Sequence, residues 1–142
     1  MVTAVDTSVL VDVLLDDPQH AQASAAALRQ AGAEGRLALC EATLAEITPV
    51  LEARLLAEFL ADWKLGFSAG SEASARLAGE MFRLHLTRGG KRGRVVPDFL
   101  IAAHAQVHAD RLLARDRGYY RDYFNDLVVW YPTADSRQPQ TK

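Results

Sequence analysis

The sequence predicts a three-layer α/β/α fold built around a mostly parallel β-sheet. Four short apolar runs, at residues 2–5, 36–40, 111–114 and 127–131, have the length of buried strands. Segments with helical spacing separate them, and strands that alternate with helices are typical of parallel βαβ units. We find no internal repeat and no linker in the 142 residues. We therefore expect one domain over residues 1–135 and a polar, disordered tail over 136–142.

The helices predicted in this frame cover residues 8–15, 19–31, 43–63, 71–86 and 98–109. Pro18 ends the first, and Gly32 is expected to stop the Ala-rich second. Pro49 should kink or divide the third helix, because proline removes a backbone donor. Ser71 is a plausible cap for the fourth. Pro97 suits the first turn of the last, which reads as clearly amphipathic.

Three segments are less well defined by their sequence. Residues 63–69 could form a loop or a short edge strand, and residues 118–124 a short aromatic helix or a turn. Residues 87–94 are turn-like and basic. At the first junction, between strand 2–5 and the helix, Thr7 and Ser8 are suited to cap the first helical turn.

Composition narrows the classes of protein. An apolar content of 49% and a charged content of 24% are ordinary for a soluble globular protein. The net charge of −2 means that any contact with nucleic acid must come from a local basic patch. Cys40 allows no internal disulfide and is predicted to be a buried hydrophobe. We expect neither a signal peptide nor a membrane span, and therefore a cytoplasmic protein.

Four acidic residues occupy the junctions between elements. Asp6 follows the first strand, Asp116 follows the strand at 111–114, and Asp98 opens a helix. Glu46 is placed in the first turn of the helix after the second strand. Because the carboxyl ends of parallel strands and the starts of the following helices share one edge of the sheet, all four could meet in one cleft.

Each of these acids also has a purely structural interpretation. Asp6 and Asp98 could cap helices, and Asp116 could be a turn residue. Thr43 and Glu46 match the capping-box spacing. These readings explain any one residue well, but they explain four acids at one sheet edge less well.

If the four carboxylates meet, they need a counter-charge, because like charges a few Å apart raise one another's pKa. An all-oxygen set suits Mg²⁺ or Mn²⁺, and there is no Cys or His cluster to indicate zinc. Such an ion commonly acts on phosphate substrates by orienting water and neutralising negative charge.

A basic stretch leads into Asp98 and favours contact with a phosphate backbone. It contains no acid, it includes three glycines and His85, and its cations are Arg83, Arg88, Lys91, Arg92 and Arg94. A solvated surface loop is the alternative interpretation. No G-x-S-x-G elbow indicates a serine hydrolase, and no phosphate-binding glycine loop is present.

Four segments together resemble the PIN domain family, and in particular the VapC-type toxins of bacterial toxin–antitoxin pairs. They are VDTSVLVDVL from Val5, TLAEITPVL from Thr43, VPDFLIAAHA from Val96 and LLARDRGYYRDYF from Leu112. The resemblance implies a five-stranded parallel sheet, with a short edge strand near Gly66.

The same resemblance implies a Mg²⁺- or Mn²⁺-dependent endoribonuclease that forms a homodimer. A cognate antitoxin would neutralise it by inserting a C-terminal segment into the active-site groove. Asp6 and Asp98 match the main metal ligands, Asp116 the third acidic ligand, and Glu46 the acid that completes the site. Ser8 matches a small polar residue that helps to organise the pocket.

Two other functions remain open on the sequence. One is a PIN-like module that binds RNA without turnover, and it predicts salt-sensitive binding that Mg²⁺ does not convert into product. The other is a Mg²⁺-dependent phosphotransfer protein, which is disfavoured because Thr7-Ser8 follows Asp6, so the Asp-x-Asp nucleophile motif is missing.

Overall fold

The computed structural model describes residues 1–90, 96–115 and 120–133, and its strands form one five-stranded sheet. The order across the sheet is β3-β2-β1-β4-β5, and every neighbouring pair is parallel. The strands are β1 (Val2–Val5), β2 (Arg36–Leu39), β3 (Leu65–Phe67), β4 (Arg111–Leu113) and β5 (Val129–Trp130). The predicted fold class is confirmed, and β3 is the edge strand that the family resemblance implied near Gly66.

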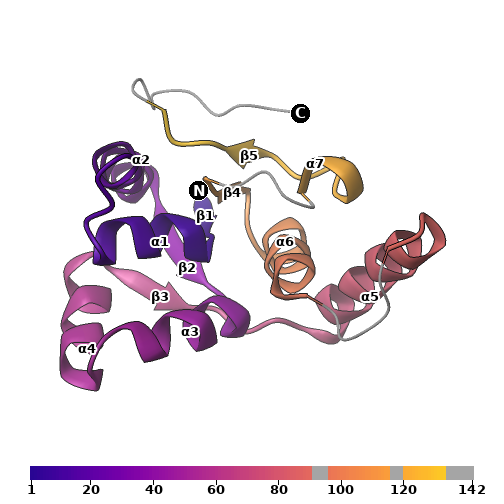
Figure 1. Ribbon diagram of the computed structural model, residues 1–142, viewed down its shortest axis with the longest axis horizontal. Coiled ribbons are helices and arrows are strands. Elements are labelled where there is room, and N and C mark those ends of the chain that lie inside the picture. The colour runs from indigo at the N-terminus through magenta and orange to yellow at the C-terminus, as the bar shows by residue number, and fades with distance from the viewer. Residues whose placement is uncertain (91–95, 116–119, 134–142) are drawn as a thin grey trace.

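Helices cover both faces of this sheet, as Figure 1 shows. One layer contains α1 (Thr7–Leu14), α2 (Ala21–Glu34), α3 (Glu41–Ile47), the short 3₁₀ turn η1 (Thr48–Val50) and α4 (Ala53–Asp62). The other contains α5 (Glu72–Thr87), α6 (Pro97–His108) and the single turn α7 (Tyr120–Tyr123). No helix in the described ranges is both long enough and apolar enough to cross a bilayer.

Alternate residues of the central strands feed two separate cores. Val5 and Leu113 pack with α1, α2 and α4, whereas Ala4 and Leu112 pack with α6 and α7. Burial on both faces explains why the strands are continuous apolar runs rather than alternating ones. Cys40 is buried beside the second of these cores, as predicted.

The end of α2 differs from the predicted one because it is set by packing against the backbone of Met1. Gly32 does not stop α2, which continues to Glu34 and ends at Gly35. A Cβ at Gly35 would collide with the carbonyl of Met1, so close backbone approach requires glycine at that place. Pro49 divides the long predicted helix as expected, because α3 ends at Ile47 and α4 begins at Ala53.

Two elements near the C-terminus also differ from expectation. α6 is not amphipathic: residues around its whole circumference are buried, because it lies between α5 and the sheet. The last strand is shorter than its apolar run, with only Val129–Trp130 in the ladder. Ser71 caps α5 as predicted and accepts a hydrogen bond from the N–H of Ser74.

Candidate active site

Asp6 is buried at the carboxyl end of β1, at the centre of the sheet. Its side chain is 4% exposed, and its N–H donates to the Leu113 carbonyl at 2.8 Å. The Asp6 carboxylate caps α1 by accepting from the N–H of Ser8 at 3.0 Å. The Ser8 hydroxyl donates to the same Oδ2 atom. The structural interpretation of Asp6 as a helix cap is therefore confirmed, and the expectation that the Thr7 or Ser8 hydroxyl caps this turn is wrong.

The other oxygen of Asp6 accepts a hydrogen bond from Tyr120, the first residue of α7. The Tyr120 hydroxyl lies 2.5 Å from Oδ1, and its ring is buried in the core beside α6. Burial raises the pKa of Tyr120 well above its ordinary value of 10.0, and the negative charges of Asp6, Asp98 and Glu46 raise it further. Asp6 bonds this hydroxyl directly, and Asp98 and Glu46 act on its pKa through their charge.

Glu46 reaches this region from α3, although not in the way that its spacing predicted. The capping box is wrong, because α3 begins at Glu41 behind Cys40, and Thr43 is buried inside the helix. Glu46 therefore belongs to the second turn, and its exposed carboxylate accepts a hydrogen bond from Thr7 Oγ1 at 2.5 Å. This contact joins α3 to the first turn of α1.

Asp98 is the second residue of α6, where the partial positive charge of a helix N-terminus favours a carboxylate. It is half-buried, and the N-cap position belongs to Val96 rather than to Asp98. The interpretation of Asp98 as the N-cap of α6 is therefore wrong.

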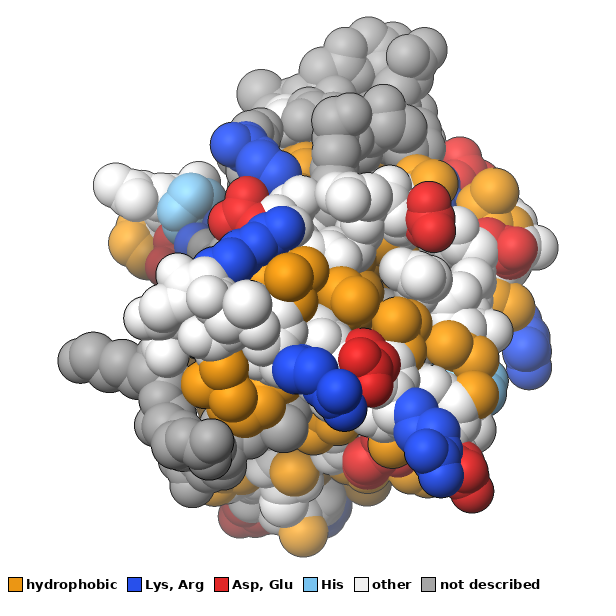
Figure 2. All heavy atoms as spheres, turned by 90° about the vertical axis from the view of Figure 1, so that its right-hand side faces the viewer, with side chains coloured by type: hydrophobic (Ala, Val, Ile, Leu, Met, Phe, Trp, Pro, Cys, Tyr) orange, Lys and Arg blue, Asp and Glu red, His pale blue; other side chains and the backbone are white. Residues whose placement is uncertain are grey.

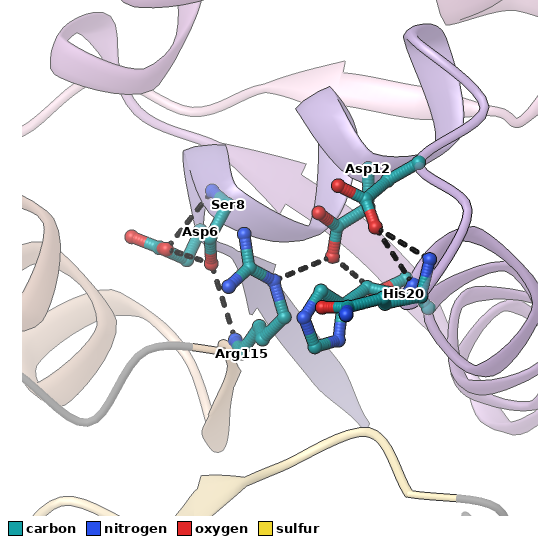
Figure 3. A network of polar contacts seen from close by, with 8 residues as sticks. Asp6, Ser8, Asp12, His20 and Arg115 are labelled. Atoms are coloured by element: carbon teal, nitrogen blue, oxygen red, sulfur yellow. Dashed lines mark hydrogen bonds and ion pairs between the residues drawn. The ribbon is translucent and has the colours of Figure 1, made fainter.

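The predicted fourth acid, Asp116, lies outside the described residues. The residue before it, Arg115, forms two hydrogen bonds to α1. The Arg115 N–H donates to the Ser8 hydroxyl at 3.1 Å. Its guanidinium donates from Nε to Oδ2 of buried Asp12 at 2.8 Å, and the Ser24 hydroxyl donates to the same oxygen. Figure 3 shows Asp6 and Ser8 on one side of Arg115 and Asp12 on the other. The end of β4 is therefore hydrogen-bonded directly to α1.

The predicted basic segment is described only in part. Lys91, Arg92 and Arg94 fall outside the described residues. Arg88 ends α5, lies over the ring of Tyr123 at 5.0 Å and donates to the Asp122 carbonyl at 3.2 Å. Figure 2 shows that basic, acidic and hydrophobic side chains alternate on the described part of this face. Arg83, for example, pairs with Glu80 at 3.2 Å.

The chemistry of the donor set fits a hard divalent cation. Asp6, Glu46 and Asp98 offer carboxylate oxygens, which are ligands that Mg²⁺ prefers. Among the described residues, no three Asp, Glu, His or Cys side chains form a complete metal-binding group. Mg²⁺ typically keeps several waters and takes one or two protein carboxylates, so an open site of this kind is compatible with it.

The reasoning from sequence missed Tyr120, Asp12 and Arg115. Tyr120 and Asp6 are 114 positions apart, and no spacing rule connects them. The available signals were a tyrosine placed after Asp116 and a carboxylate, Asp12, on a helix that was otherwise apolar.

The comparisons with known proteins agree with the fold. The sequence model of the PIN domain family matches residues 3–124. A search of curated proteins finds no match. VapBC2 from Rickettsia felis, solved with a DNA fragment from its promoter, is 20% identical with a TM-score of 0.70, covering 91% of this chain and 97% of that one.

Two further solved structures are similar. VapBC-1 from nontypeable Haemophilus influenzae is 16% identical with a TM-score of 0.69, covering 92% of this chain and 98% of that one. A toxin–antitoxin complex from Klebsiella pneumoniae is 20% identical with a TM-score of 0.59, covering 83% and 89%. At these identities the structural likeness concerns the fold.

Proposed function

The chain belongs to the PIN domain family, and on that premise we propose that it is a Mg²⁺- or Mn²⁺-dependent endoribonuclease acting as the toxin of a toxin–antitoxin pair. One observation carries the proposal. Asp6, at the carboxyl end of β1, bonds Tyr120 of α7, and its neighbour Thr7 bonds Glu46 of α3. Asp98 lies in the first turn of α6. A fold has little structural reason to gather three carboxylates at one strand end, whereas a metal-dependent nuclease requires such a group.

Asp6 and Asp98 would hold the cation, with Glu46 and Asp116 completing the site. When bound, a divalent cation makes water a better nucleophile and offsets the charge that develops on the phosphoryl oxygens. Asp6 is held rigidly by its hydrogen bonds, whereas Glu46 is exposed and has one hydrogen bond from Thr7. Glu46 is therefore suited to accept a proton from water at the solvent side.

The substrate is proposed to be single-stranded RNA held through its phosphates. Arg88, Lys91, Arg92 and Arg94 lie within the ten residues before Asp98 in the sequence, so a basic segment leads into a proposed metal ligand. Contacts of this kind position the backbone without reading its sequence.

The proposed partner is a cognate antitoxin whose C-terminal segment enters the active-site groove, and the toxin is proposed to be a cytoplasmic homodimer. The similar structures are two VapBC assemblies and a toxin–antitoxin complex, and they support this partner. Carboxylates around an open site would favour a basic residue in the inhibiting segment.

Cleavage of labelled single-stranded RNA by the purified protein tests this function. We expect product with Mg²⁺ or Mn²⁺, none with EDTA, and none from Asp98→Asn. Asp16→Asn is the matched control, because Asp16 is an exposed aspartate beyond the end of α1. Wild-type protein that binds RNA with strong salt dependence but yields no product with either metal would instead support the non-catalytic RNA-binding module.

A further inference from the structure

The Asp6 carboxylate is held at both of its oxygens by donors from different parts of the chain. Oδ2 accepts from the N–H and the hydroxyl of Ser8, in the first turn of α1. Oδ1 accepts from the Tyr120 hydroxyl, in α7, at 2.5 Å. With one donor set on each oxygen, the carboxylate cannot turn about its Cβ–Cγ bond without breaking a hydrogen bond to a charged acceptor.

We propose that Tyr120 is a positioning residue whose buried hydroxyl fixes the orientation of the Asp6 carboxylate for metal binding and catalysis. The inference rests on the proposed function for its catalytic part. Ser8 alone holds the carboxylate only at Oδ2. The bond from Tyr120 adds a second fixed point at Oδ1. Since Oδ2 already accepts two hydrogen bonds, it is the second lone pair of Oδ1 that is left for a cation.

The surroundings of Tyr120 distinguish the role of its ring from the role of its hydroxyl. The ring lies in the core formed with α6 and β5, where a phenylalanine would fill nearly the same space. A buried hydroxyl is unfavourable unless it is hydrogen-bonded, and here it donates to Oδ1 of Asp6. The ring alone is enough to fill the core, and the hydroxyl serves as a hydrogen-bond donor to the Asp6 carboxylate.

The Asp6–Ser8 unit also receives a hydrogen bond from Arg115, at the end of β4. Arg115 and Tyr120 are the described neighbours of residues 116–119, and both are bonded to the Asp6–Ser8 unit. The two ends of the span that contains Asp116 are thus fixed relative to Asp6.

Tyr123 supplies a matched control within the same helical turn. Its hydroxyl lies 3.1 Å from Nδ1 of His85, and its ring packs edge-on against Phe99 at 5.4 Å. Tyr120→Phe and Tyr123→Phe therefore remove the same atom from two rings of α7, but only the first removes a donor from Asp6.

The test compares wild type, Tyr120→Phe and Tyr123→Phe for Mn²⁺ affinity by calorimetry on metal-free protein and for RNA cleavage at saturating Mn²⁺. We expect Tyr120→Phe to weaken Mn²⁺ binding and to lower kcat by about tenfold each, the usual effect of removing a group that orients a metal ligand. KM should change by less than about twofold, and Tyr123→Phe should match wild type within about twofold in all three.

Unchanged Mn²⁺ affinity and kcat in Tyr120→Phe would overturn the proposal. So would losses that equal the unfolded fraction measured by circular dichroism in the same buffer, because Tyr120 would then be only structural. If wild type cleaves no RNA but Tyr120→Phe alone loses Mn²⁺ affinity, the nuclease function fails and the positioning role stands.

Discussion

The Arg115 guanidinium donates from Nε to Oδ2 of Asp12 at 2.8 Å, and this ion pair joins the end of β4 to the middle of α1. The Asp12 side chain is 2% exposed and that of Arg115 is 30% exposed. A buried carboxylate is strongly unfavourable unless it is paired. Because the N–H of Arg115 also bonds Ser8, the ion pair helps to set the position of Asp6 as well.

Asp12→Asn should therefore destabilise the protein, by about 1–3 kcal/mol, because Arg115 and Ser24 lose a charged acceptor. Urea unfolding followed by circular dichroism measures the change. Asp16→Asn, at an exposed position, should stay within about 0.5 kcal/mol of wild type. Equal midpoints for the two variants would show that the ion pair does not stabilise the fold.

Thr7→Val should lower RNA cleavage more than it lowers stability. It removes the 2.5 Å hydrogen bond to Glu46 while keeping the side-chain shape, and both groups are partly or fully exposed. We expect kcat to fall by about tenfold, the kinetic equivalent of about 1.4 kcal/mol. A kcat within twofold of wild type would mean that Thr7 does not position Glu46.

Replacing Arg88, Lys91, Arg92 and Arg94 by glutamine should weaken RNA binding in a salt-dependent way. The slope of log K against log salt is negative, and each lost phosphate contact reduces its magnitude by about 0.7 for a single strand. Fluorescence anisotropy at several salt concentrations should thus give, for the variant, a slope smaller in magnitude than that of wild type by up to about 3. An unchanged slope would place these cations away from the RNA.

His104 predicts a loss of stability in mild acid. Its ring is buried beside Ser68, and burial first, then the nearby positive charge of His108, lowers the pKa of His104 below its ordinary 6.5. Glu41 and the bond to Ser68 oppose this shift without reversing it. The imidazole of His104 therefore binds a proton more readily in the unfolded chain than in the folded protein. The contribution of His104 to stability is full above about pH 6.5 and is lost as the pH falls through the lower pKa that His104 has in the folded protein.

Unfolding free energies at about pH 7.5 and 5.5 measure this effect. His104→Gln keeps a group able to bond Ser68 but does not titrate, so its stability should change less over the same interval. If both proteins lose the same stability, the acid sensitivity comes from other groups.

The positions of Asp6 at a strand end and of Asp98 in the first turn of a helix could be predicted from sequence, because they follow from chain topology. Asp6 and Asp98 come directly after a strand end and at a helix start, and those points share one edge of a parallel sheet. Their placement therefore required only the order of strands and helices. The structure confirmed that order and brought Glu46 to the same edge, although from the second turn of α3.

The contacts that hold Asp6 could not be predicted, because they join residues that are distant in sequence. Tyr120 and Arg115 are recognised only when β4 is placed next to β1, with α7 beyond it. The boundary errors have a similar origin. Gly32 carries a local stop signal, but the position of Met1 decides that α2 ends at Gly35 instead.

The most direct test of the central claim is the melting temperature of metal-free protein titrated with Mn²⁺. A ligand at about 100 times its Kd stabilises the folded state by about 2.7 kcal/mol, which raises the midpoint of a chain of this size by roughly 5–10 °C. We predict this rise for wild type and for Asp16→Asn, and none for Asp6→Asn combined with Asp98→Asn. An equal rise in the double variant would contradict the account, because the ion would then bind away from these carboxylates.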